Sequence, residues 1–213
     1  MEINVVEKVM KVNDALAQQV RQRLDAAGIA AINLISAPGS GKTSLIEAAL
    51  RREDAPHVGV IEGDPDTTLD AERIAACNVP VTQINTAGGC HLEANLVLEA
   101  LDRFDLAAIE LLLIENVGNL VCPVSFDLGE RARVAVVSTT EGHDKPAKYP
   151  KLFRTADVVV LNKVDLLEHI DFDAERFRSY VEQLKPGMLI LDVSCRTGQG
   201  IDAWAAWLRQ YIR

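Results

Sequence analysis

Residues 36–44 read Ser-Ala-Pro-Gly-Ser-Gly-Lys-Thr-Ser, and they decide the fold class of this chain. The apolar run at 29–35 predicts a buried strand before them, and residues 45–50 predict the start of a helix after them. A glycine turn between a strand and a helix N-terminus points successive backbone N–H groups into one concavity, where the helix dipole adds positive charge. The stretch therefore predicts a phosphate-binding loop made of Pro38, Gly39, Ser40, Gly41, Lys42, Thr43 and Ser44.

The residue types in this loop suit the chemistry of a nucleotide phosphate. Gly39 and Gly41 permit a close backbone approach that a Cβ atom would obstruct. Lys42 can reach the terminal phosphates, and the hydroxyl of Thr43 can bind Mg²⁺. The usual form of the motif opens with glycine where this chain has Ser36. The alternative, a chance glycine turn, fits the flanking strand and helix less well.

The composition is that of an ordinary globular protein with an acidic surface. The 213 residues are 48% hydrophobic and 25% charged, which fits a single domain. A net charge of −9 without a basic block argues against nonspecific nucleic-acid binding. No apolar run approaches the roughly 18 residues of a membrane span. Residues 1–4 show no basic region leading into an apolar segment, so we expect a cytoplasmic protein without a secretory signal.

Apolar runs alternate with helical patterns along the rest of the chain. Strands are expected at 29–35, 57–61, 79–84, 107–114, 134–137, 158–161 and 188–193. Helices are expected at 45–50, 72–74, 92–101, 146–153, 174–184 and 201–212. Continuous apolar strands that alternate with helices are typical of parallel sheets flanked by helices. Residues 29–213 therefore predict one α/β domain of the P-loop NTPase type, with a mostly parallel, doubly wound sheet.

Residues 1–28 predict an additional helix before the first strand. Apolar residues recur there at three- and four-residue steps, namely Val9, Val12, Leu16, Val20 and Leu24. Gly28 is a typical helix end. We expect this amphipathic helix to pack on the nucleotide-binding domain, and a helix dedicated to a partner protein is the alternative.

A second motif indicates which base is bound. Residues 162–165 read Asn-Lys-Val-Asp and follow a predicted strand, as in the guanine-recognition motif of GTPases. The carboxylate of Asp165 can accept hydrogen bonds from both N1–H and the 2-amino group of guanine, which adenine does not offer. Asn162 can tie this motif to the phosphate loop, and the stem of Lys163 can lie along the base. Ser194, Cys195 and Arg196 follow the last strand and can support the base. The motif predicts GTP and GDP as ligands, and a solvated polar turn is the alternative.

Acidic residues at predicted strand ends are candidates for Mg²⁺ binding and catalysis. Asp64 is expected to bind Mg²⁺ or to orient water, with Asp66 in reserve, because ligands of such sheets bind at the strand C-termini. Glu115 can face the phosphates through a water, and Gly118 can offer its N–H to the γ-phosphate. The catalytic candidates are thus Lys42, Asp64, Asp66 and Glu115, and the Mg²⁺ candidates are Thr43, Asp64 and Glu115. For both Asp64 and Asp66, an Asx turn in the loop before a helix is the alternative.

Cys90, His91 and Cys122 form a candidate site for a softer metal. Thiolate and imidazole ligands select Ni²⁺, Zn²⁺ or copper over Mg²⁺. Three ligands need a fourth, from water or from a second subunit, and buried thiols with a surface histidine are the alternative. Cys122 lies so close in sequence to Gly118 that loss of the γ-phosphate should also move a metal ligand.

Together these motifs resemble the HypB family of GTPases, which mature [NiFe]-hydrogenases. The segments that carry the resemblance are the phosphate loop, Glu-Gly-Asp at 62–64, Gly-Gly-Cys-His at 88–91, Glu-Asn-Val-Gly-Asn-Leu-Val-Cys-Pro at 115–123, the 140–150 segment and Asn-Lys-Val-Asp. The resemblance implies GTP-regulated nickel insertion into a hydrogenase large subunit beside a HypA-type nickel chaperone. We expect GTP hydrolysis to be slow, because no glutamine in the sequence is evidently placed to orient water. The resemblance also implies a homodimer that forms with nucleotide and metal, with Cys90, His91 and Cys122 binding Ni²⁺ or Zn²⁺ between subunits. Some members carry an N-terminal cysteine-rich motif or histidine-rich tract, and this sequence shows neither.

Three rival interpretations are separable by experiment. The related urease-maturation GTPases typically carry Cys-Pro-His, whereas Val124 follows Cys122 and Pro123 here. A small-molecule kinase would prefer ATP. A nucleotide-gated scaffold whose cysteines bind no metal would show unchanged nickel binding when Cys122 is replaced by alanine.

Overall fold

The computed structural model describes residues 5–64 and 66–212, with side chains from residue 9 onward. Residues 1–4, on which the expectation about secretion rests, lie outside the described residues. Within the described residues, seven strands form one sheet in the order β3-β2-β4-β1-β5-β6-β7. They are β1 (Ala30–Ser36), β2 (Val58–Asp64), β3 (Val81–Asn85), β4 (Leu111–Glu115), β5 (Ala132–Ser138), β6 (Val158–Asn162) and β7 (Ile190–Asp192). All neighbouring strands are parallel, so their carboxyl ends meet at one edge of the sheet.

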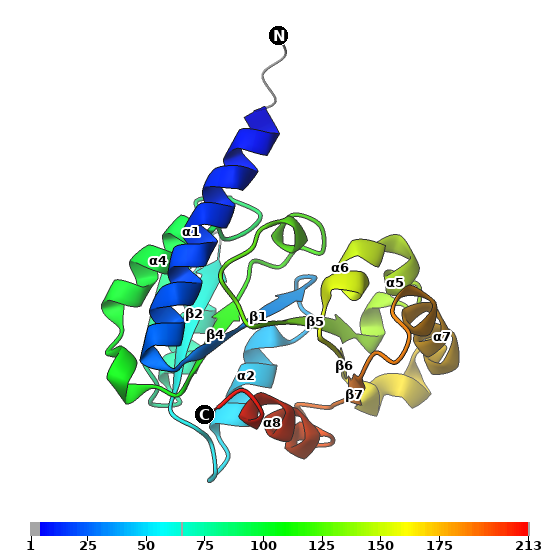
Figure 1. Cartoon of the computed structure of the whole chain (residues 1–213). Helices are drawn as coiled ribbons and strands as arrows, with labels where there is room; N and C mark the ends of the chain where they lie inside the picture. The colour runs from blue at the N-terminus through cyan, green and yellow to red at the C-terminus, as the bar shows by residue number, and fades with distance from the viewer. Residues whose placement is uncertain (1–4, 65, 213) are drawn as a thin grey trace.

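Helices cover both faces of this sheet (Figure 1). They are α1 (Val5–Ala27), α2 (Lys42–Leu50), α3 (Leu69–Ala75), α4 (Ala94–Ala100), α5 (Lys145–Lys148), α6 (Pro150–Thr155), α7 (Ala174–Leu184) and α8 (Ile201–Arg209). Helices α1 and α4 lie side by side on one face, whereas α2 and α8 pack on the other around the buried Trp204. Helices α6 and α7 cover the β5–β6 end with Phe153 and Phe177. Within the described residues, none of these helices combines the length and apolar character needed to cross a membrane.

The expected strands and helices are present, but several boundaries differ. The strand expected at 107–114 begins only at Leu111, because Asp105 accepts a hydrogen bond from the Ala107 N–H and holds residues 106–108 in a 3-10 turn. The single helix expected at 146–153 is divided into α5 and α6. Pro150 disfavours helical angles at Tyr149, which adopts φ −126° and ψ 53°.

Helix α1 buries Val20 and Leu24 of its expected apolar stripe, but its packing face is rotated toward Asn13 and Ala17. The buried residues are Asn13, Ala17, Val20 and Leu24. Val9 and Val12 are instead 44% and 61% exposed. The helix approaches the loop before β5 so closely that a Cβ atom on Gly129 would lie 2.6 Å from the Ala17 carbonyl oxygen. The polar Asn13 interrupts the apolar stripe and therefore hides the true packing face from a hydrophobicity pattern.

Candidate nucleotide and metal site

The phosphate loop lies between the C-terminal end of β1 and the start of α2. Gly39 and Gly41 have φ angles of 73° and 96°, which favour glycine. A Cβ atom on Gly41 would also lie 2.4 Å from Asn162 Nδ2, so no side chain fits there without displacing Asn162. Asn162 Nδ2 donates to the Ser40 carbonyl at 2.9 Å. The asparagine that ends β6 therefore fixes the loop after β1, as expected from the two motifs.

Beside this loop lies a cavity of about 510 Å³ at the carboxyl edge of the sheet. Its lining includes Pro38, Gly39, Gly41, Lys42, Thr43, Ser44, Glu62, Asp64, Asp70, Arg73, Glu115, Gly118 and Lys163. Thr43 Oγ1 donates to Glu115 Oε1 at 2.8 Å, and Lys42 Nζ lies 4.0 Å from the same oxygen. Lys42 Nζ also donates to Ser36 Oγ at 3.0 Å. A hydroxyl, a carboxylate and an ammonium group thus converge at the start of α2.

A second cavity of about 440 Å³ adjoins the first and shares Gly41, Ser44 and Lys163 with it. Its other lining residues are Glu47, Ala48, Arg51, Asn162, Asp165, Leu166, Cys195 and Arg196. Lys163 Nζ donates to the Gly39 carbonyl at 2.8 Å, so the lysine spans the boundary between the two cavities. The two cavities therefore adjoin along shared residues, one beside the phosphate loop and the other beside Asn162 and Asp165.

The loop after β7 forms part of the wall of the second cavity. Cys195 Sγ lies 3.5 Å from Asn162 Oδ1, and burial raises the pKa of Cys195 to about 11, so the thiol stays neutral. Ser194 is fully buried and lies behind the cavity, where its Oγ accepts from the Thr197 N–H at 3.2 Å. Cys195 and Arg196 thus reach the cavity, whereas Ser194 holds the turn.

Two buried carboxylates make the first cavity strongly acidic. Glu62 and Glu115 are 2% and 3% exposed, and Oε2 of each has no hydrogen-bond partner among the described residues. Burial, followed by the charge of Glu115, raises the pKa of Glu62 to about 8. Burial also raises the pKa of Glu115 to about 7, against the opposing charge of Lys42. Carboxylate oxygens without partners, beside the Thr43 hydroxyl, are a donor set that suits Mg²⁺.

Asp64 and Asp66 occupy different places. Asp64 ends β2 and lines the first cavity, but its Oδ1 also accepts from the N–H groups of Asp66 and Thr67 at 2.8 and 2.6 Å. The turn that the sequence suggested as an alternative is therefore present, and Asp64 lines the cavity as well. Asp66 is exposed beyond this turn and is absent from the lining of the cavity. The structure thus brings Asp64 to the candidate site and leaves Asp66 outside it.

Several lining residues were not expected from the sequence. Glu62 lies on the same face of β2 as Asp64, because side chains two apart on a strand share a face, and this alternation could have identified it. Asp70 and Arg73 reach the cavity from α3, where Arg73 donates to Ser44 Oγ at 3.0 Å. Nothing in the local sequence of α3 indicates this position, because it depends on how α3 packs beside α2.

Glu141 is a further unexpected contact of the phosphate loop. Its Oε1 accepts from Ser40 Oγ at 2.6 Å and from the Ser138 N–H at 2.9 Å. Lys145 Nζ lies 3.6 Å from its other oxygen. The segment after β5 therefore also holds the phosphate loop.

The structure brings Cys90, His91 and Cys122 together. One ligand atom from each lies within 4.8 Å of the others, and Cys90 Sγ lies 3.4 Å from His91 Nδ1. Contact with the Cys122 thiol raises the pKa of Cys90. His91 Nε2 has no hydrogen-bond partner among the described residues. Two thiols and an imidazole this close together form a donor set for a thiophilic divalent metal.

One short segment connects the candidate metal ligands to the phosphate loop. It begins at Glu115 in the first cavity and passes Gly118, where a Cβ atom would lie 3.0 Å from three atoms of Pro38. It then turns at Asn119, whose Oδ1 accepts from the Cys122 N–H at 3.3 Å. Residues 115–122 therefore touch both groups of candidate residues.

The comparison with known proteins agrees with these motifs. The model of the CobW/HypB/UreG nucleotide-binding domain matches residues 30–192. The chain is 48% identical to the hydrogenase maturation factor HypB of Azotobacter vinelandii over 212 residues, covering 98% of this chain and 69% of that protein. This chain belongs to the HypB family. The family and the P-loop fold expected from the sequence are both confirmed.

Solved HypB structures have the same fold along nearly the whole chain. HypB from Archaeoglobus fulgidus is 38% identical with a TM-score of 0.88, covering 95% of this chain and all of that one. HypB from Helicobacter pylori, solved in complex with nickel, is 34% identical with a TM-score of 0.89, covering 94% of this chain and 97% of that one. The match therefore includes the elements that bear the candidate site.

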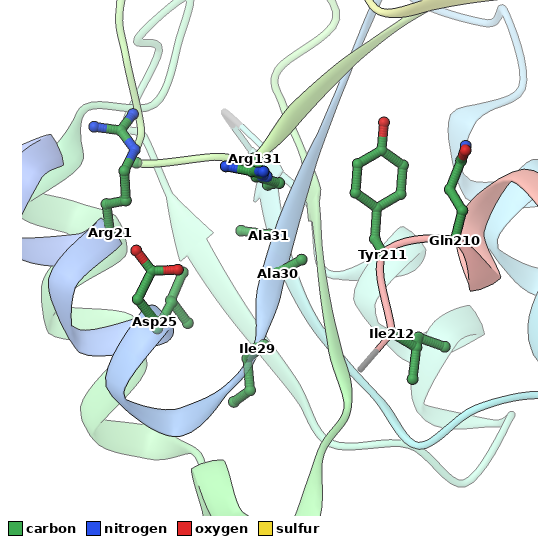
Figure 2. Close-up of a pocket in the computed structure, with 11 residues that line it drawn as sticks. Arg21, Asp25, Ile29, Ala30, Ala31, Arg131, Gln210, Tyr211 and Ile212 are labelled. Carbon is green, nitrogen blue, oxygen red and sulfur yellow. The ribbon is translucent and has the colours of Figure 1, made fainter.

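A further cavity of this HypB-family chain, of about 290 Å³, lies at the opposite end of β1 (Figure 2). Figure 2 shows Arg21 and Asp25 of α1 on one side of the strand and Gln210 and Tyr211 on the other. Among the described residues, none of the candidate nucleotide or metal residues lines this cavity. The candidate site is thus confined to the carboxyl edge.

Proposed function

We propose that this HypB-family chain binds GTP, hydrolyses it slowly to GDP and phosphate, and uses the nucleotide state to control nickel binding during [NiFe]-hydrogenase maturation. The observation that carries the proposal is the 115–122 segment, which contacts the phosphate loop at Gly118 and contributes Cys122 to the metal ligands. Any movement of this segment on loss of the γ-phosphate would alter the geometry of the ligands.

In this proposal the nucleotide lies along the two adjoining cavities. Its phosphates contact the loop at 38–44, Lys42 and the N–H of Gly118. Its guanine contacts Asn162, Lys163 and Asp165, with the 194–196 turn behind the base. What supports this is the continuity of the two cavities and the position of Asp165 at the end of the second.

Mg²⁺ would be held by Thr43, Asp64 and Glu115, and it would neutralise charge on the phosphates. The acidic lining makes this cation necessary, because a polyphosphate would otherwise meet several carboxylates. Lys42 adds positive charge where negative charge develops in the transition state. No glutamine lines the first cavity in the described part of the chain, so no amide is placed to orient the attacking water, and we expect slow hydrolysis.

Nickel would be cargo held by Cys90, His91 and Cys122, and Zn²⁺ can use the same ligands. The fourth ligand would come from water or from a second copy of the chain, which makes a metal- and nucleotide-dependent homodimer part of the proposal. Family membership and the nickel complex of the Helicobacter pylori protein support this assignment. A HypA-type chaperone would supply the metal, and the hydrogenase large subunit would receive it.

The proposal is tested by binding Ni²⁺ to the wild type and to Cys122→Ala, with Cys77→Ala as the matched cysteine control. Cys77 is half-buried and lies far from the ligand group, against the core beneath α2 and α8. We expect Cys122→Ala to lose most of its nickel affinity and Cys77→Ala to keep it. Equal nickel binding by both variants would favour the scaffold interpretation. A preference for ATP over GTP in the same preparation would instead favour a kinase.

A further inference from the structure

Two buried asparagines bridge the segments that carry the metal ligands. One segment follows β3 and contains Cys90 and His91, and the other follows β4 and contains Cys122. We propose that Asn13 and Asn116 are positioning residues that hold these two segments at the separation required for nickel. The inference rests on the proposed nickel site, but neither asparagine is among its ligands.

Asn116 contacts the first segment directly. It is 1% exposed, and its Oδ1 accepts from the N–H of Leu92, the residue after His91, at 3.2 Å. The same oxygen accepts from the Val117 N–H at 3.0 Å. Its Nδ2 donates to Asn33 Oδ1 at 3.2 Å. A side chain next to Glu115 therefore sets the position of the backbone beside His91.

The contacts of Asn116 also continue through the core to the later part of its own segment, beyond Cys122. Asn33 on β1 is fully buried, and its Nδ2 donates to Glu130 Oε1 at 3.4 Å. Glu130 accepts from Arg133 Nε, and Arg133 donates in turn to the carbonyls of Val124 and Phe126 at 3.0 and 3.2 Å. The backbone just beyond Cys122 is thus held by the same polar network.

Asn13 makes a second link between the two segments. This residue of α1 is 3% exposed, and its Oδ1 accepts from the Ala94 N–H at 2.9 Å, shortly after His91. Its Nδ2 donates to the Asp127 carbonyl at 2.8 Å, shortly after Cys122. Between these two bonds, the rings of His91 and Phe126 stack with centroids 3.9 Å apart. A single amide can satisfy a donor in one segment and an acceptor in the other only when the segments are correctly spaced.

The physical consequence is specific to metal binding. Replacing a bridging amide by alanine leaves buried N–H and C=O groups unpaired, which the segments can relieve only by moving apart. Contacts that orient metal ligands from behind typically change metal affinity by about 10- to 100-fold. Asn13 lines neither nucleotide cavity, so its loss should leave nucleotide affinity unchanged.

The test is titration of Ni²⁺ into Asn13→Ala, followed by the nickel–thiolate charge-transfer absorption, with GDP affinity measured in parallel. We expect nickel affinity to fall by about 10- to 100-fold with an altered absorption band, and GDP affinity to stay within about twofold. The nickel affinity of Asn116→Ala should fall by a similar factor. The nickel affinity of the double variant should fall by less than the product of the two single fold-losses, because both amides hold the same pair of segments.

Two controls separate positioning from general destabilisation. Leu24→Ala removes from the same helix a buried apolar side chain, which can make no hydrogen bond to either segment, and it should lower the melting temperature while keeping nickel affinity. Asn95→Ala removes an exposed amide from α4 and should change neither. If Asn13→Ala fails to fold, Asn13→Asp keeps the acceptor for Ala94, loses the donor to Asp127, and should show the same direction of change.

The outcomes distinguish this inference from the proposed function. Unchanged nickel affinity in Asn13→Ala, when Cys122→Ala has lost it, would overturn the positioning role alone. Equal losses in Asn13→Ala and Leu24→Ala would also overturn it, because stability would then explain the effect. Nickel affinity that is unchanged in Cys122→Ala would instead contradict the proposed metal site itself.

Discussion

Glu62 is a buried acid surrounded by other acidic side chains. Its carboxylate is buried beside Glu115, Asp64 and Asp70, with one oxygen unpartnered among the described residues. A carboxylate in such surroundings is stabilised either by a proton or by a cation. Folding in the absence of nucleotide and Mg²⁺ should therefore depend on pH.

Glu62→Gln should stabilise the nucleotide-free protein in alkaline but not in acidic solution. Burial raises the folded-state pKa of Glu62 to about 8 from 4.5. The folded state then binds the proton more tightly, so the contribution to stability is complete below pH 4.5 and is lost as the pH rises to 8. The variant should therefore exceed the wild type by about 1–3 kcal/mol at pH 8 and match it near pH 4.5.

Urea unfolding at both pH values measures this difference. Glu99→Gln, at an exposed position on α4, is the matched control and should change nothing. A Glu62→Gln protein that is less stable than the wild type at pH 8 would contradict the assignment of a strained, unpaired carboxylate.

Asp165→Asn should weaken guanine binding without creating adenine binding. The carboxylate can accept from two guanine donors, and an asparagine replaces one acceptor by an N–H that faces a donor. We expect GDP affinity to fall by about 100-fold or more, with ADP affinity unchanged and low. Fluorescence titration with both nucleotides checks this, with the nearby exposed Glu168→Gln as the control. Retention of GDP affinity by Asp165→Asn would place the base elsewhere.

The 115–122 segment is the element on which communication between the two sites depends. It has a glycine where it touches Pro38, and the tight contact leaves no room for a side chain. Its last residue is a metal ligand in the proposed function. A small displacement at Gly118 would therefore be felt both at the phosphate loop and at Cys122.

Gly118→Ala should weaken the response of this segment to the γ-phosphate. The new Cβ atom would lie 3.0 Å from three atoms of Pro38, so the segment or the loop must shift by a few tenths of an ångström. We expect affinity for a nonhydrolysable GTP analogue to fall at least about tenfold, a loss of about 1.4 kcal/mol. GDP affinity should change far less, because GDP has no γ-phosphate. Gly187→Ala, in an open turn remote from the site, is the control. Equal loss for the two nucleotides would show general damage to the loop.

The parts of these elements that could be predicted from the sequence are those with local causes. Ser40 and Asn162 are 122 residues apart, yet each belongs to a short motif with its own chemistry, and the structure joins them by a hydrogen bond. The strand ends that carry Asp64 and Glu115 follow from apolar runs. Asn13, Asp70 and Arg73 could not be predicted, because their roles arise from how α1 and α3 pack and not from the residues around them.

Within the described residues, the molecule presents three candidate metal ligands at or near its surface, and these do not form a closed shell. Cys90 is exposed, and His91 and Cys122 are only half-buried. Because Ni²⁺ and Zn²⁺ take at least four ligands, the same face of a second copy is a suitable source of the remainder. The proposal of a homodimer follows from this incomplete set.

Sedimentation should therefore detect a metal-dependent dimer. We expect the wild type to shift from monomer to dimer when Ni²⁺ and a GTP analogue are added together. Cys122→Ala should remain a monomer under the same conditions, and Cys77→Ala should dimerise. A wild-type protein that binds nickel yet stays monomeric would require that water completes the coordination.

The central claim is that nucleotide and nickel affect one another through one stretch of backbone. The most direct measurement is the nickel dissociation constant of the wild type with GDP and with a nonhydrolysable GTP analogue, together with the affinity for each nucleotide with and without nickel. We expect the nickel constants to differ by about fivefold or more, and the nucleotide affinities to change by the same factor, as linkage requires. Identical nickel constants in the two nucleotide states would contradict the account.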